Sequence, residues 1–217
     1  DLSAWDTASM TSLYEIFSYA SVFNSPLPFD TSSMTSMAAM LQGANAFNQP
    51  LEFDCSLVTN MGGMLQSTTV FNQQVAFDTS SVTSMSSMLA SADAFNQLLA
   101  FDLRSVVDLD FMFSNGADAM VADLNSWDTA SVTTIRGMFP NSGFNGNVMG
   151  WDVASVKTMG LSSCGFSPGS GMFYANYDFN GDIGGWDVSS VTAMARAADQ
   201  PCAYPAPANA RPHPRLH

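Results

Sequence analysis

The sequence predicts a repeat solenoid in which each 24-residue coil contributes one short parallel β-strand and one short helix. An aromatic residue followed by Asp recurs along the chain, at spacings of 24, 24, 24, 24, 26, 24 and 35 residues. Units this short cannot bury an apolar face alone, so about seven to eight coils must stack. The pairs are Trp5-Asp6, Phe29-Asp30, Phe53-Asp54, Phe77-Asp78, Phe101-Asp102, Trp127-Asp128, Trp151-Asp152 and Trp186-Asp187.

The helix is predicted from residues 29–52, FDTSSMTSMAAMLQGANAFNQPLE, which represent the unit. Their apolar positions are spaced by three and four residues, the period of a helix face. Asp-Thr-Ser-Ser before them supplies acceptors for the first free N–H groups of a helix, and Gly43 weakens its end, so about two turns fit. The apolar positions are Met34, Met37, Met40, Leu41 and Ala44.

The strand is predicted from the residues that follow the helix. Leu51 and Phe53 are two positions apart with Glu52 between them, and this alternation is typical of a strand. Pro50 suits the first position of a strand better than its middle. Stacked coils would then pair like strands in parallel, about 4.8 Å apart.

Stacking places equivalent residues in columns, with aromatic residues and Met inside. An Asn column is expected to act as an internal ladder that satisfies backbone groups at the turn. The second aromatic column comprises Phe23, Phe47, Phe71, Phe95, Met120, Phe144 and Phe179, and the Asn column comprises Asn24, Asn48, Asn72, Asn96, Asn145 and Asn180.

The domain boundaries follow from where the repeat stops. Residues 1–195 are predicted to form the repeat solenoid, and 160–171, GLSSCGFSPGSG, read as a flexible insertion loop. Residues 196–217 abandon the repeat and hold half of the prolines, so a Pro-rich irregular tail is expected there.

Charge narrows the classes of partner. The chain contains six Lys and Arg residues and 19 Asp and Glu residues, which gives a net charge of −13. An acidic surface repels phosphate backbones and anionic headgroups, so no nucleic acid is expected as a partner. No apolar run approaches the roughly 20 residues of a spanning helix, so no membrane insertion is expected either.

The unit resembles the repeat of the BspA-like leucine-rich-repeat surface proteins, the mycoplasma-lipoprotein-type repeat of 24 to 25 residues. The similarity lies in the pattern W-D-T-S-x-V-T-x-M-x-x-M-F followed by F-N-x-x-L, and it covers residues 1–195. The resemblance implies a leucine-rich-repeat-like solenoid on secreted or cell-surface proteins, with adhesion as the usual role. It supplies no catalytic residue.

The chain is not expected to be an enzyme. Residues 1–195 contain no His, one Lys (Lys157) and two Arg (Arg104 and Arg136), which excludes most devices that need an imidazole base and most zinc sites. No cofactor is expected.

The Asp column offers three interpretations. Each Asp can accept backbone N–H groups of the following turn, as Asp does in Asx-turns, and this is favoured. The oxygen-rich turns could instead hold calcium, and a carboxylate pair acting as a glycosidase is least favoured. The calcium candidates are Asp30, Asp54, Asp78 and Asp102.

A column of Thr residues is expected to face outward, interrupted by Val107 and Lys157. Regular Thr arrays on flat faces are typical of ice-binding surfaces, although Thr at a helix start is already explained by capping. The column comprises Thr11, Thr35, Thr59, Thr83, Thr133 and Thr192.

The leading functional hypothesis is a surface-exposed adhesion or interaction module that binds a protein or a glycan. The candidate binding residues are aromatic side chains off the core columns, Tyr14, Tyr19, Tyr174 and Tyr177. The alternatives are a structural spacer or filament component that self-associates end to end, and an ice-binding face. An extracellular or cell-surface location is expected for the adhesion or interaction module.

Overall fold

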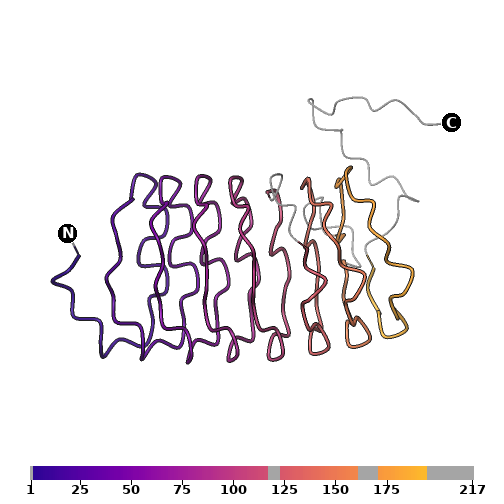
Figure 1. Ribbon diagram of the computed structural model, residues 1–217, viewed down its shortest axis with the longest axis horizontal. Helices are drawn as coiled ribbons and strands as arrows, with labels where there is room; N and C mark the ends of the chain where they lie inside the picture. The colour runs from indigo at the N-terminus through magenta and orange to yellow at the C-terminus, as the bar shows by residue number, and fades with distance from the viewer. Residues whose placement is uncertain (1, 117–122, 161–170, 195–217) are drawn as a thin grey trace.

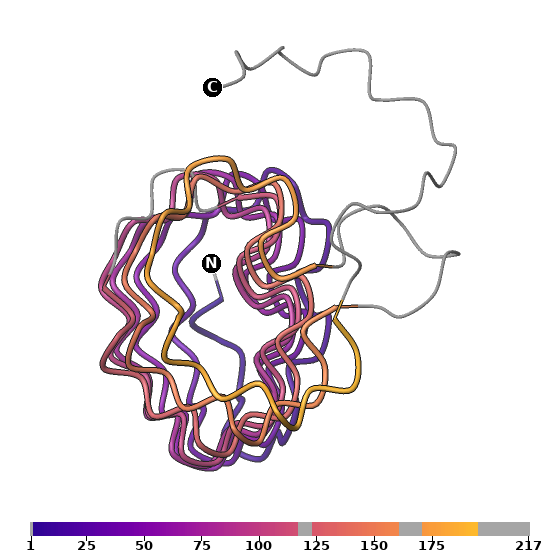
Figure 2. The same cartoon turned by 90° about the vertical axis from the view of Figure 1, so that its right-hand side faces the viewer.

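The computed structural model describes residues 2–116, 123–160 and 171–194. In these residues the chain winds through successive coils that stack along one axis, with the N-terminal coil at one end and residues 171–194 at the other (Figure 1). Seen along that axis, the coils superimpose on one closed outline (Figure 2). Within the described ranges there is no helix and no multi-residue strand, and so no helix that could cross a membrane.

The predicted leucine-rich-repeat-like solenoid, with one strand and one helix in each coil, is therefore wrong. The backbone is a series of tight turns, and neighbouring coils are joined by isolated parallel bridges instead of a sheet. These bridges lie where the helix was expected to start. They join Ser12 to Ser36, Ser36 to Asn60, Asn60 to Ser84, Ser84 to Asp108, Asp108 to Thr134, Thr134 to Thr158 and Thr158 to Ala193.

The helix fails to form because alternate N–H groups bond to the next coil. The N–H groups of Met37 and Ala39 donate to the carbonyls of Asn60 and Gly62, at 3.0 and 2.8 Å. After Ala39, the N–H of Met40 donates back to the carbonyl of Met37 at 3.3 Å and closes a turn. Half of the N–H groups are thus unavailable for the bonds to residue i−4 that define an α-helix.

The backbone conformation also excludes a helix, because two positions in each coil have positive φ. Ala39 has φ 52° and Gly43 has φ 69°, in the left-handed region that a right-handed helix cannot contain. A side chain with a Cβ pays about 1 to 2 kcal/mol there, so the bonds between coils must hold the conformation in place. The equivalent residues of other coils are Glu15, Gly63, Ser87, Phe111 and Gly137, and Tyr19, Ser67, Ser91, Asn115, Asn141 and Ala175.

The expected strand at Leu51–Phe53 is absent because side chains, and not backbone groups, join the coils there. The described residues contain no backbone hydrogen bond between this segment and a neighbouring coil. Instead, the N–H of Asn48 donates to Oδ1 of Asn24 at 2.9 Å, and Nε2 of Gln49 donates to the same oxygen at 3.1 Å. The expected Asn ladder is confirmed, since Asn72, Asn96 and Asn180 repeat the Asn48 bond.

The aromatic columns are confirmed. Phe23, Phe47, Phe71 and Phe95 stack with ring centroids 5.9 to 6.1 Å apart. In the other column the buried Trp127 and Trp151 stack at 6.0 Å, and their indole N–H groups donate to backbone carbonyls at 3.0 and 2.8 Å. Burial is weaker toward the ends of the stack, where Trp5 is 46% exposed and Phe23, Phe179 and Trp186 are partly buried. The predicted column member Met120 lies outside the described residues.

The predicted insertion loop and tail fall almost wholly outside the described residues, which exclude 161–170 and 195–217. On either side of the insertion, the N–H of Met172 donates to the carbonyl of Met159 at 3.1 Å. The chain therefore re-enters the stack beside the point where it left.

We expect Phe47→Ala to lower the free energy of unfolding by about 3 to 5 kcal/mol, because its ring is fully buried between two stacked rings. Urea denaturation followed by circular dichroism measures this. The matched control is Val22→Ala, a side chain 88% exposed, which should change stability by less than about 0.5 kcal/mol. Equal effects of the two substitutions would contradict the stacked core.

Gly43→Ala should cost about 1 to 2 kcal/mol of stability. An added Cβ would meet a left-handed φ of +69° and would lie 2.7 Å from Cδ1 of Tyr19. Gly185→Ala is the control, since no atom lies within 4 Å of a Cβ there. Adding Tyr19→Ala to Gly43→Ala should recover the steric part of the loss but not the backbone part, and full recovery would show that φ plays no role.

Candidate ligand-binding grooves

The Asp residues at the coil corners serve the turns that follow them. Oδ1 of Asp30 accepts the N–H of Ser32 at 3.0 Å and its hydroxyl at 2.7 Å. These two bonds lower the pKa of Asp30. The favoured Asx-turn interpretation is confirmed at Asp6, Asp30, Asp54, Asp78, Asp102, Asp128, Asp152 and Asp187, each of which accepts the N–H two residues ahead.

The calcium hypothesis placed the ion on Asp30, Asp54, Asp78 and Asp102. At the first three, the hydroxyl of the Ser two residues ahead donates to Oδ1. At Asp102, Arg104 binds both oxygens, and its guanidinium helps to bring the pKa of Asp102 to about 2. Within the described part of the chain, no group of three or more acidic, His or Cys side chains could hold a metal ion.

The Thr column faces outward as expected, but its hydroxyls serve the stack. Oγ1 of Thr35 donates to the carbonyl of Thr11 at 3.1 Å, and Thr59 and Thr83 each repeat this bond to the preceding Thr. The column therefore presents methyl groups beside hydroxyls that are already bonded. Ice binding stays a prediction.

A groove of about 380 Å³ runs across four coils along the tight turns, and we call it the turn-face groove. Small residues form its floor, and amide and hydroxyl side chains border it. Nε2 of Gln42 donates to Oε1 of Gln66 at 2.7 Å, which holds the two amides in line across neighbouring coils. The lining residues are Tyr14, Glu15, Ala38, Ala39, Gln42, Asn60, Gly62, Gly63, Gln66, Ser84, Ser86 and Ser87.

Tyr14 is the predicted binding residue that the structure places in this groove. Its side chain is 60% exposed, and a hydrogen bond to Glu15 raises its pKa. Tyr19 lies on the same end coils, against Gly43. Tyr174 and Tyr177 are exposed at the opposite end of the stack, so the four tyrosines do not form one site (Figure 1).

Sequence reasoning missed a polar network in the middle of the stack. The buried carboxylate of Asp110 forms an ion pair with Arg136 and accepts the hydroxyl of Thr134 at 2.5 Å. Next to it, burial raises the pKa of Asp108, whose Oδ2 accepts the hydroxyl of Ser84 at 3.2 Å. The signal in the sequence was that Asp108 and Asp110 stand where the preceding coil has Ser84 and Ser86.

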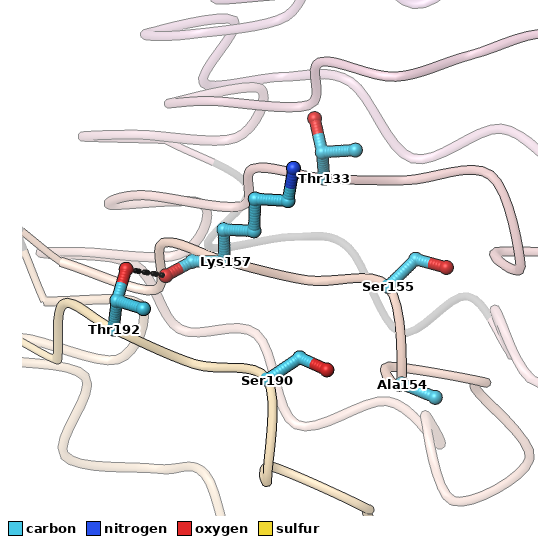
Figure 3. A pocket seen from close by; sticks show the side chains of 6 residues that line it. All are labelled: Thr133, Ala154, Ser155, Lys157, Ser190 and Thr192. Atoms are coloured by element: carbon cyan, nitrogen blue, oxygen red, sulfur yellow. Dashed lines mark hydrogen bonds between the residues drawn. The ribbon is translucent and has the colours of Figure 1, made fainter.

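A second groove, of about 590 Å³, lies near the C-terminal end and was also missed. We call it the Lys157 groove; Figure 3 shows the Lys157 side chain extending toward Thr133, with Ser155 and Ser190 on other parts of the lining. Lys157 takes the place of a Thr in the outward column, and its carbonyl still accepts the hydroxyl of Thr192 at 3.2 Å. The lining residues are Thr133, Ala154, Ser155, Lys157, Ser190 and Thr192.

The described residues offer binding groups more readily than reactive ones. Burial, with help from the charges of Asp54 and Asp78, raises the pKa of Cys55 to about 12, so its thiol stays protonated at neutral pH. The carboxylate of Asp110 already accepts a hydrogen bond from the guanidinium of Arg136. The carboxylate of Asp108 accepts the hydroxyl of Ser84 and the N–H of Asp110. The polar groups that line the two grooves are amides, hydroxyls, the Tyr14 ring, the Glu15 carboxylate and the Lys157 ammonium.

Comparison with protein families finds one match, described as "Mycoplasma protein of unknown function, DUF285". Its pattern matches residues 1–97, 74–164 and 167–204, which together cover most of the chain. Comparison with curated proteins and with solved structures finds no match.

The corner hydrogen bonds should make part of the stability depend on pH. Because the folded pKa of Asp54 lies below its ordinary value of 3.8, its contribution is present above that value and is lost as the pH falls through the folded pKa. Ser56→Ala removes the hydroxyl that donates to Asp54 at 2.7 Å. We expect the variant to be less stable than the parent at about pH 6, and the difference to vanish near pH 2.

Urea midpoints measured across this pH range test the expectation, and the parent at each pH serves as the control. A difference between variant and parent that is the same at both ends would show that the Ser56 hydroxyl does not interact with the charged carboxylate.

Proposed function

Since the chain belongs to the Mycoplasma protein family of unknown function DUF285, we propose that it is a non-catalytic, surface-exposed interaction module that binds a glycan or a protein. The observation that carries this proposal is the turn-face groove. It is continuous over four coils, and polar side chains line it at regular intervals.

The chemistry of the groove favours a glycan. Sugars present hydroxyl groups that pair with amides and hydroxyls, and flat apolar faces that pack on aromatic rings. In their mutual bond, Gln42 uses only its NH₂ group and Gln66 uses only its carbonyl oxygen. The carbonyl oxygen of Gln42 and the NH₂ group of Gln66 are left for a ligand. Tyr14 stands at one end with most of its ring exposed.

The groove floor explains why a chain of sugars could approach the backbone. Ala38, Ala39, Gly62 and Gly63 have short or absent side chains, so the turns themselves form the surface. A repeated structure of this kind suits a repeated ligand, because successive coils offer similar groups at similar spacing.

We also propose a relation to the BspA-like surface proteins and a location outside the cell or on its surface. The repeat pattern of the sequence supports a relation to the BspA-like surface proteins, whose role is thought to be adhesion. A location outside the cell or on its surface fits that relation and the net charge of −13.

Binding to immobilised neutral oligosaccharides tests the proposal. We expect Tyr14→Ala to weaken binding about five- to tenfold, because the ring would lose its contact with a sugar face. Gln66→Ala should weaken it by a similar factor through loss of an amide.

Leu98→Ala serves as the control, since it removes an exposed apolar side chain, 71% exposed, that does not line the groove. Equal losses in all three variants would contradict binding in the turn-face groove. A protein that binds no oligosaccharide and assembles into growing filaments would favour the alternative of an end-to-end spacer.

A further inference from the structure

The Lys157 groove contains a positive charge that the fold does not use. The described residues include three basic side chains, and two of them are committed to carboxylates, Arg104 to Asp102 and Arg136 to Asp110. In the part of the chain that the structure describes, the Lys157 ammonium forms no ion pair and no side-chain hydrogen bond. Among the described residues, no group occupies its amine.

The backbone around Lys157 is held firmly on both sides. Its N–H donates to the carbonyl of Thr133 at 2.8 Å, and its own carbonyl accepts the N–H of Thr192 at 2.9 Å. A Thr at this position would join the coils equally well, as Thr133 and Thr192 do. The lysine side chain thus adds nothing to the stack that the repeat residue would not supply.

Two hydroxyls that line the same groove are also not bonded to the stack among the described residues. Ser81, Ser105 and Ser131 donate their hydroxyls to carbonyls of the preceding coil, at 2.8, 2.7 and 2.7 Å. Ser155 and Ser190 occupy the same position of the repeat, but their exposed hydroxyls have no partner among the described residues. Both line the groove next to Lys157 (Figure 3).

We propose that the Lys157 groove is a binding site, separate from the turn-face groove, for the carboxylate of an acidic sugar. The ammonium of Lys157 pairs with the carboxylate, and the hydroxyls of Ser155 and Ser190 bond to the carboxylate or to the sugar ring. A volume of about 590 Å³ is in the range of small-molecule sites, and it suits one or two sugar rings better than a protein surface.

The charge of the protein selects a single anionic group over a polyanion. With a net charge of −13, the surface repels a ligand that carries many negative charges. Asp152 and Asp187 lie within three residues of Ala154 and Ser190, which line the groove, so acidic residues accompany the lining in both coils. One carboxylate can reach Lys157, whereas a sulfated chain would meet these charges along its length.

The experiment uses the fact that Lys157 is the only lysine in the chain. Lysine labelled with carbon-13 gives one set of side-chain NMR signals, which report on this site alone. We expect glucuronate to shift the Lys157 signals in a saturable way at physiological salt, and glucose to leave them unchanged. Lys157→Thr, which restores the repeat residue, should keep the folded spectrum of the backbone and weaken glucuronate binding about five- to tenfold, measured in this variant by the backbone amide signals of Ser155 and Ser190.

Ser155→Ala and Ser190→Ala keep the labelled lysine, and each should weaken the saturable shift. Val107→Thr, the other interruption of the Thr column, is the matched control and should not alter binding. A shift that sodium chloride or acetate reproduces at equal concentration would overturn the proposal. It would also be overturned if an acidic peptide or heparin shifted the signals in a saturable way while glucuronate did not.

Discussion

The structure depends on one arrangement of backbone hydrogen bonds, in which alternate N–H groups of the tight turns donate to the next coil. The bonds from Met37 and Ala39 to Asn60 and Gly62 recur along the stack. They hold two residues of each coil at positive φ, and these left-handed positions return the chain toward the core every few residues. Burial of Met34, Met37, Met40 and Leu41 follows from this geometry. Neither the stacked rings nor the side-chain ladders could keep their register without it, because each requires equivalent residues to lie directly above one another.

In the segment of each coil around Asn48, neighbouring coils are joined by side-chain hydrogen bonds and not by backbone ones. Asn48 and its equivalents bond to the backbone of the neighbouring coil, and Asp side chains close the corner turns. Beside the bridges, Thr hydroxyls only add to backbone bonds, since both the N–H and the hydroxyl of Thr35 donate to the carbonyl of Thr11. This division explains why the residues that are most conspicuous in the sequence have structural tasks. A ligand must therefore be recognised by side chains that the stack leaves uncommitted, which is why the two grooves, and not the regular columns, are the places to look for function.

The two grooves differ in chemistry because the repeat departs from its pattern in different ways. In the turn-face groove the departures are Tyr14 and paired Gln residues over a floor of Ala and Gly, and the result is a polar surface with Glu15 as its one charged side chain. In the Lys157 groove, one ammonium and two hydroxyls stand where other coils have a Thr and bonded Ser residues. Between the grooves, Asp108, Asp110 and Arg136 form a network whose charges mostly satisfy each other. That network stabilises neighbouring coils and offers little to a ligand.

The sequence by itself determined the 24-residue period, the aromatic columns, the Asn ladder and the Asx-turns, because each depends on equivalent residues meeting in adjacent coils or on bonds within two residues. It also singled out Tyr14 as an exposed ring. Only the tertiary structure decided the backbone of each coil. A spacing of three and four apolar residues is common to a helix and to successive turns, and the choice was made by N–H groups that find carbonyls 23 residues ahead. The grooves were decided in the same way, since Lys157, Ser155 and Ser190 are separated by up to 35 residues and meet only when the coils stack.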